Sequence, residues 1–116
     1  MDTLSEVAYF TANVEAMAQF YKMLLDVEPV ASSPTMAIFL IGNTKLFIHA
    51  IYTPNQNELP PENHIAFTVD DVDHSCAKLV QQGLILEVSP QNYYWGRSAY
   101  LRDPDGHLIE LNQTTP

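Results

Sequence analysis

Basic side chains are scarce in this chain. Five Lys and Arg residues stand against 14 Asp and Glu residues, which gives a formal net charge of −9. Nucleic acids and anionic membrane surfaces are bound through basic patches, and five cations are too few to build one. We therefore expect neither a nucleic acid nor a membrane as partner, and we interpret the acidity as a solubility feature.

Cysteines and long apolar runs are also missing. The single cysteine, Cys76, excludes an internal disulfide and fits a reducing compartment. No apolar stretch approaches the ~20 residues that a membrane-spanning helix needs. The first residues lack the basic region of a signal peptide. We therefore expect a cytoplasmic protein.

The remaining composition is typical of a folded protein. Hydrophobic residues make up 47% and charged residues 16% of the 116 positions, which excludes a disordered chain. A chain of this length can bury one core but not two independent ones. We expect a single domain, residues 1–116, with one unit at about 4–52, a proline-rich connector at 53–62 and a second unit at about 63–113.

The two units show the same order of elements. In each, a short strand precedes a residue suited to cap a helix, Asn13 or Asp71, and apolar residues at helical spacing follow. Three strand-like segments separated by turn residues come after each helix. The expected strands are 7–11, 28–32, 36–41 and 45–52, and then 64–69, 84–88, 98–102 and 107–112.

The repetition predicts the fold class. Asn13 lies 58 positions before Asp71, and Lys45–His49 matches Gly106–Glu110 at an offset of 61. Self-similarity of this kind indicates a duplicated structural unit. We expect an α+β fold made of two βαβββ repeats.

The same offsets pair side chains that can bind a metal. Glu6 falls on His64, and His49 falls on Glu110. Two imidazoles and two carboxylates suit a divalent ion such as Zn, Ni, Mn, Fe or Co, with positions left for water or substrate. The simpler alternatives are that Glu6 is a solvent-facing residue and that His49 is a half-buried imidazole bonded to a neighbour.

Several segments resemble a known family. They are Asn63-His64-Ile65-Ala66-Phe67-Thr68-Val69-Asp70-Asp71, Asp103-Pro104-Asp105-Gly106-His107-Leu108-Ile109-Glu110-Leu111, and Phe20-Tyr21 with Leu24-Leu25-Asp26, where a Gly is more usual than Asp26. Together they resemble the vicinal oxygen chelate superfamily, which includes glyoxalases, bleomycin resistance proteins and extradiol dioxygenases. The resemblance implies two βαβββ repeats that form a curved, mostly antiparallel sheet around a cleft. It also implies a homodimer, whose cleft can combine units from two chains.

The resemblance implies ligand positions as well. In metal-bearing members the ligands occupy the places held here by Glu6, His49, His64 and Glu110. Glu6 and His49 depart from the glyoxalase pattern, which has His or Gln first and Glu second. We expect a glyoxalase-type, metal-dependent enzyme, a lyase or a related enzyme, acting on a small vicinal-oxygen substrate. Glu6 or Glu110 would be the catalytic base.

Other activities of the family fit less well. Fosfomycin-resistance enzymes use three ligands plus basic residues for the phosphonate, and this chain offers Arg97 and Arg102 nearby. The dioxygenases usually have longer chains of four units.

The aromatic residues support an alternative. In bleomycin-resistance-like members a Trp-Gly pair, here Trp95-Gly96, borders a groove that sequesters a flat drug. The alternative function is therefore a metal-free protein, without a cofactor, that sequesters an aromatic drug or metabolite and so confers antibiotic resistance. Its predicted ligand contacts are Tyr94, Trp95, Arg97, Tyr100, Tyr9 and Phe39. Aromatic residues on strands are more often core or dimer interface.

Overall fold

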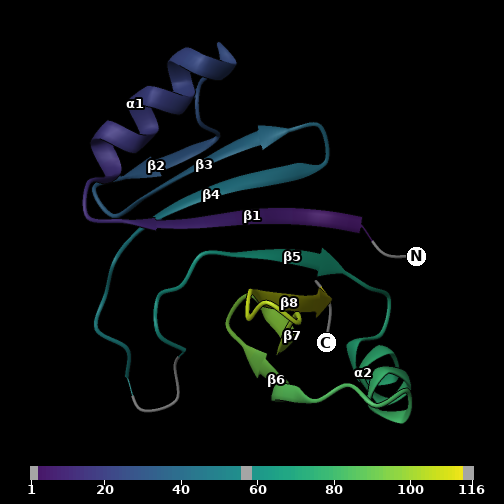
Figure 1. Cartoon of the computed structure of the whole chain (residues 1–116). Coiled ribbons are helices and arrows are strands. Elements are labelled where there is room, and N and C mark those ends of the chain that lie inside the picture. Colours follow the sequence, from purple (N-terminus) through teal and green to yellow (C-terminus); the bar gives the residue numbers. More distant parts are fainter. Residues whose placement is uncertain (1–2, 56–58, 114–116) are drawn as a thin grey trace. The chain divides into compact units, whose positions relative to one another are not determined.

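The computed structural model describes residues 3–55 and 59–113 (Figure 1). The chain folds into two compact units. We call Glu6–Asn63 the N-terminal unit, and residues 64–113 together with residues 3–5 the C-terminal unit. The elements in chain order are β1 (Thr3–Thr11), α1 (Val14–Leu25), β2 (Ala31–Ser33), β3 (Met36–Ile41), β4 (Thr44–Ala50), β5 (His64–Thr68), α2 (Val72–Gln81), β6 (Leu86–Tyr93), β7 (Gly96–Arg102) and β8 (Leu108–Gln113).

The N-terminal unit is a four-stranded sheet with one helix. Its strand order is β2-β3-β4-β1, in which β1 and β4 run parallel and the other pairs are antiparallel. α1 begins where the Asn13 side chain accepts a hydrogen bond of 3.0 Å from the backbone N–H of Ala16. Apolar residues of α1 then pack on the sheet around a core of Val14, Ala37, Phe39, Leu46 and Ile48.

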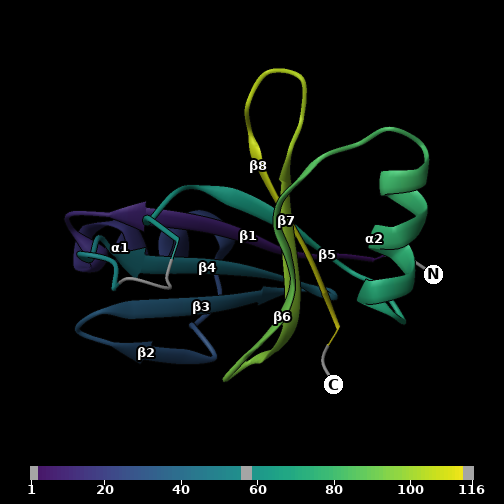
Figure 2. The same cartoon turned by 90° about the horizontal axis from the view of Figure 1, so that it is seen from below.

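The C-terminal unit repeats this arrangement. Its strand order is β5-β8-β7-β6, with β5 and β8 parallel and the other pairs antiparallel. α2 begins at Asp71, whose carboxylate accepts a hydrogen bond of 3.0 Å from the N–H of His74. The helix lies on one side of β6, β7 and β8, which Figure 2 shows nearly edge-on. The core on that side contains Val69, Val72, Cys76, Ala99, Leu101 and Leu111.

The α+β fold with two βαβββ units is therefore confirmed, while some strand limits differ. β6 extends to Tyr93, well past the expected end at residue 88. Tyr93 pairs with Gly96, so Tyr94 and Trp95 form a two-residue turn between β6 and β7. That the units form a single domain remains a prediction. In the part of the chain that the structure describes, no helix is long and apolar enough to cross a membrane.

Candidate functional site

His64 and Glu110 form a close, nearly buried pair in the C-terminal unit. They lie on the neighbouring parallel strands β5 and β8, where Ala66 is the register partner of Glu110. Side chains alternate along a strand, so His64, two residues before Ala66, shares the face of Glu110. His64 Nε2 is 3.1 Å from Glu110 Oε1, and the side chains are only 12% and 6% exposed.

Two further donors hold the other oxygen of Glu110. The Ser98 hydroxyl donates to Oε2 over 3.0 Å, and the Asn112 Nδ2 donates to the same oxygen over 3.1 Å. Thr68 Oγ1 donates to Asn112 Oδ1 over 2.7 Å, which turns the amide nitrogen toward the carboxylate. The carboxylate is thus fixed by donors on both of its oxygens.

These contacts set the charge of Glu110. Burial raises the pKa of this carboxyl group, but the hydrogen bonds from His64, Asn112 and Ser98 and the charge of His64 outweigh burial. The net result is a pKa below the ordinary value. Glu110 is therefore an anion at neutral pH although it is 5% exposed.

An aromatic group adjoins the pair. Trp95 stacks on Tyr93 with ring centroids 4.4 Å apart and planes at 6°, and Tyr94 meets the Trp95 ring edge-on at 4.9 Å. Tyr100 lies 6.3 Å from both the Tyr93 ring and the His64 ring. Burial and the nearby Glu110 carboxylate raise the pKa of Tyr93. The aromatic side chains and the His64–Glu110 pair therefore belong to one continuous group within this unit.

The two ligand-capable atoms of the pair, His64 Nε2 and Glu110 Oε1, are placed to bind one divalent ion. A separation of 3.1 Å between Nε2 and Oε1 suits a hydrogen bond, and it also suits two ligands of one ion with bonds of about 2.0–2.2 Å. An imidazole and a carboxylate are ligands that Zn, Mn, Fe, Co and Ni accept. Held by Ser98 and Asn112, the carboxylate has the outer hydrogen bonds typical of a metal ligand.

Glu6 and His49 lie in the N-terminal unit and are separated there. Glu6 pairs with Lys45 in the β1–β4 ladder, and His49 pairs with Phe10, four residues further along. At about 3.3 Å per residue, their backbones are about 13 Å apart along the sheet. This ladder therefore does not bring Glu6 and His49 together.

His49 sits among aromatic rings. Its Nδ1 is 2.6 Å from the carbonyl oxygen of Ala50, and the rings of Phe10, Phe47 and Tyr52 have centroids 5.5–5.8 Å from the imidazole. This environment matches the half-buried imidazole bonded to a neighbour. The Nδ1 contact also leaves Nε2 as the nitrogen that can bind an ion. A ligand role for His49 stays a prediction.

The two ladders correct the alignment of the repeats. Ala8 pairs with Phe47 in the N-terminal unit, and the equivalent Ala66 pairs with Glu110 in the C-terminal unit. Phe47, rather than His49, therefore occupies the place equivalent to Glu110. The offset of 61 was wrong by two positions because it was drawn from side-chain types without knowledge of the strand register.

Three other predicted contacts face the helices. Phe39 is 0% exposed within the core beneath α1, and Tyr9 packs on Tyr21 of that helix. Arg97 binds Asp73 of α2, so it points away from Ser98, its neighbour in β7. Packing and tethering explain these three positions. Trp95, Tyr94 and Tyr100 belong to the aromatic group described above.

The sequence reasoning missed Ser98 and Thr68 as partners of the site. Asn112 was recognisable, because it follows Glu110 at strand spacing and so shares its face. Ser98 is 0% exposed, and a buried hydroxyl on the strand next to a carboxylate is a signal that requires the β7–β8 register to be read.

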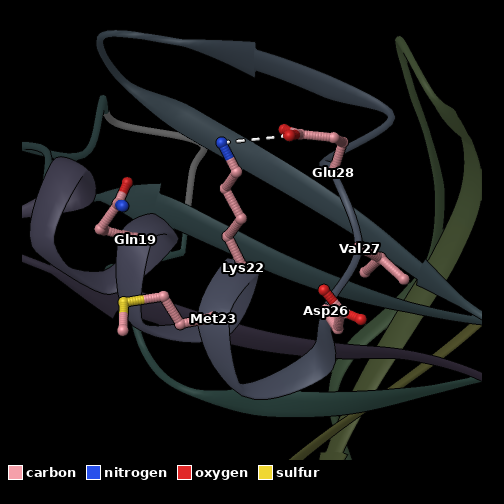
Figure 3. Close-up of a pocket in the computed structure, with 6 residues that line it drawn as sticks. All are labelled: Gln19, Lys22, Met23, Asp26, Val27 and Glu28. Atoms are coloured by element: carbon pink, nitrogen blue, oxygen red, sulfur yellow. Dashed lines mark ion pairs between the residues drawn. The ribbon is translucent and has the colours of Figure 1, made fainter.

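A separate hollow lies at the end of α1 in the N-terminal unit (Figure 3). Its volume is about 270 Å³, and it is lined by Gln19, Lys22, Met23, Asp26, Val27 and Glu28. Lys22 and Glu28 form an ion pair of 3.1 Å across it, and both side chains are well exposed. Nothing in this lining resembles the buried, hydrogen-bonded side chains around Glu110.

Comparison with known proteins shows which family the chain belongs to. The chain is 29% identical to the metallothiol transferase FosB of Staphylococcus epidermidis over 97% of this chain and 82% of that protein. It is 29% identical to the phenazine antibiotic resistance protein EhpR of Enterobacter agglomerans, over 88% of this chain and 84% of that one. A solved structure from Vibrio splendidus, a glyoxalase/bleomycin resistance protein/dioxygenase superfamily member, has the same fold with a TM-score of 0.73 at 12% identity, covering 97% of this chain and 99% of that chain. Residues 3–111 match the family as a whole, and the chain therefore belongs to the Glyoxalase/Bleomycin resistance protein/Dioxygenase superfamily.

Proposed function

We propose that this protein is a glyoxalase-type, metal-dependent enzyme that acts on a small substrate with two adjacent oxygen atoms. His64 and Glu110 hold the divalent ion. The sequence predicts Glu6 and His49 as further ligands, although the β1–β4 ladder does not bring these two residues together. The observation that carries the proposal is the 3.1 Å separation of Nε2 and Oε1 in a nearly buried pair whose carboxylate is already fixed by two other donors.

The comparisons support a metal-dependent function in general terms. A relative that aligns over nearly the whole chain is named a metallothiol transferase. Another relative, 29% identical over 99% of this chain and 88% of its own length, is named a fosfomycin resistance protein. This likeness was unexpected, because the scarcity of basic residues disfavoured a fosfomycin-resistance type. An ion bound by His64 and Glu110 would hold the two substrate oxygens and stabilise negative charge as it develops on them.

The two carboxylates suit different roles. A general base works best with a pKa near the working pH, whereas the contacts of Glu110 lower its pKa below the ordinary value. Glu110 is also held by three side chains, which suits a fixed ligand. We therefore assign the role of fixed ligand to Glu110, and to Glu6 that of a ligand that can leave the ion and act as general base.

Metal content tests this proposal directly. Elemental analysis of the purified protein, after reconstitution with Zn, Ni, Mn, Fe or Co, is expected to find one ion per site in the wild type. His64→Ala and Glu110→Gln are expected to lose it, while His74→Ala, on an exposed position of α2, keeps it. Glu6→Gln and His49→Ala show whether those residues contribute ligands. A wild type that binds no ion after reconstitution contradicts the enzyme proposal.

A positive result leads to a substrate screen. The screen covers hemithioacetals, epoxides and diols. Among them, vicinal diols and the hemithioacetals of α-ketoaldehydes carry the two adjacent oxygen atoms that the ion would hold. Glu6→Gln is expected to retain the ion better than Glu110→Gln but to lose turnover. Light scattering of the same samples tests the predicted homodimer, and it should be run with and without the ion.

The stacked aromatic rings favour a second candidate function. Trp95 on Tyr93 offers a flat surface of the kind that binds planar molecules, and one relative is named a phenazine antibiotic resistance protein. Under this alternative the protein sequesters an aromatic drug or metabolite without a metal. Phenazine is then expected to quench the fluorescence of Trp95, the only tryptophan, equally with and without EDTA.

A pair of variants separates specific from general apolar binding. Trp95→Ala is expected to abolish phenazine binding measured by calorimetry. Phe20→Ala, which removes an exposed ring from α1, should leave binding unchanged. Equal loss in both variants, or no binding by the wild type, contradicts the alternative.

A further inference from the structure

Two hydrogen-bonded arms end on the same oxygen of Glu110. In one arm, Thr68 donates to Asn112, and Asn112 donates to Oε2. In the other, the Trp95 indole Nε1–H donates to Ser98 Oγ over 3.1 Å, and Ser98 donates to Oε2 over 3.0 Å. Each arm therefore has a near donor that touches the carboxylate and a far donor that orients the near one.

The chemistry of Ser98 explains why the far donor matters. A serine hydroxyl rotates freely and can either give or accept a hydrogen bond, whereas an indole N–H can only donate. Because Trp95 donates to the Ser98 oxygen, the hydroxyl proton is left for the nearest acceptor, which is Glu110 Oε2. Ser98 is 0% exposed, so water does not compete for this proton.

We propose that Trp95 is a positioning residue for Glu110 and acts through the Ser98 hydroxyl. With Oε2 held by the two arms, Oε1 faces His64 Nε2 at 3.1 Å. The indole N–H therefore helps to set the geometry of the His64–Glu110 pair through Ser98. We call the hydrogen-bonded series Trp95–Ser98–Glu110 the relay. This inference deepens the proposed function, because it gives Trp95 a part in the same site, but the relay exists without an ion.

The far donors of the two arms differ in their exposure to solvent. Thr68 lies inside the sheet on β5, whereas Trp95 is 45% exposed in the β6–β7 turn, beside Tyr94 at 98% exposed. A molecule that stacks on the turn and rotates the indole would remove the donor from Ser98. The relay thus makes the orientation of Glu110 sensitive to what occupies the aromatic turn.

Removing one atom group at a time tests the relay. Trp95→Phe keeps a ring that stacks on Tyr93 but loses the N–H, and Ser98→Ala loses the hydroxyl. Both are expected to shift the imidazole ¹⁵N and ¹H signals of His64 in the same direction, with the smaller shift for Trp95→Phe. Phe20→Ala, which removes an exposed ring from α1 of the N-terminal unit, should leave these signals in place.

The double variant gives the decisive comparison. If Trp95 acts only through Ser98, adding Trp95→Phe to Ser98→Ala produces no further shift. Thr68→Val works through the other arm, so its shift is expected to add to that of Trp95→Phe. A Trp95→Phe shift that persists in the Ser98→Ala background, or a His64 signal that moves with Ser98→Ala but not with Trp95→Phe, overturns the proposal.

Ion binding provides a second readout that separates this proposal from the proposed function. Ser98→Ala is expected to weaken Zn²⁺ binding by about 10–100-fold, as for other outer partners of metal ligands. Trp95→Phe should weaken it less, and Phe20→Ala should leave it unchanged. If the wild type binds none of Zn, Ni, Mn, Fe and Co, the proposed function fails and the His64 signals still decide the relay. If Zn²⁺ binds but Trp95→Phe matches the wild type in both readouts, the relay is wrong and the proposed function stands.

Discussion

Arg97 holds Asp73 through two parallel hydrogen bonds, 2.7 Å from Nε to Oδ2 and 2.9 Å from Nη2 to Oδ1. Its remaining nitrogen, Nη1, donates to Asn92 over 3.0 Å. One guanidinium therefore connects β7 with α2 and β6. Because side chains alternate along β7, this contact lies on the helix side, and Ser98 points to the opposite face, toward Glu110. Arg97 fixes the strand that carries Ser98 without contacting the site.

We predict that Arg97→Ala lowers stability slightly and leaves the site intact. The ion pair is at the surface, where water and salt weaken it, so the melting temperature should fall only a little in calorimetry. Arg102→Ala, which removes a similar two-bond contact to Glu87, is the matched control. Loss of Zn²⁺ or phenazine binding in Arg97→Ala alone would show that Arg97 contacts the ligand after all.

The helices and the duplication could be predicted because their signals are local. Asn13 and Asp71 each accept a hydrogen bond from the N–H three residues later, as a capping residue does. The strands of the β7–β8 hairpin were predicted at residues 98–102 and 107–112, close to their observed limits. His64 and Glu110 were identified as a pair of ligand-capable residues, and the structure places them 3.1 Å apart.

The remaining parts depended on strand register, which the sequence does not carry. Phe47 and His49 are equally good residues for β4, and only the pairing of Ala8 with Phe47 shows which one matches Glu110. Phe39 was assigned to a ligand because strand aromatics do not reveal which face they occupy until α1 is placed. Ser98 lies in the site because β7 pairs with β8, where Ser98 is opposite Asn112. No pattern within its own segment could have identified it.

The loss of folding stability at acidic pH should depend on Glu110. Because its pKa is lower in the folded state, the ionised group stabilises the fold above the ordinary value of 4.5, and this contribution is lost as the pH falls through the lowered pKa. We predict that the wild type loses more stability than Glu110→Gln between neutral pH and pH values below 4.5. Urea denaturation at a series of pH values measures this difference. Glu15→Gln, at an exposed position in the first turn of α1, should behave like the wild type.

Phe39 should act as a core residue. Its ring is 0% exposed beneath α1, so Phe39→Ala leaves a cavity and is predicted to reduce the free energy of unfolding by about 3–5 kcal/mol. Leu40→Ala, at the next position with 48% exposure, should change it by less than about 1 kcal/mol. Denaturant unfolding of the two variants checks this contrast. Similar values for both would mean that the ring does not pack as the structure describes.

Asp26 ends α1 in a conformation that glycine adopts more easily. Its φ of 54° and ψ of 43° lie in the left-handed region, where a Cβ atom is strained and glycine is the usual residue. We predict that Asp26→Gly raises the free energy of unfolding by about 0.5–1 kcal/mol. The side chain borders the hollow at the helix end (Figure 3), so no core contact is lost. Gln82 ends α2 with a φ of −83°, which any residue adopts, and Gln82→Gly should therefore be destabilising. Denaturant unfolding that gives both glycine variants the same sign would show that backbone conformation does not control stability at these two helix ends.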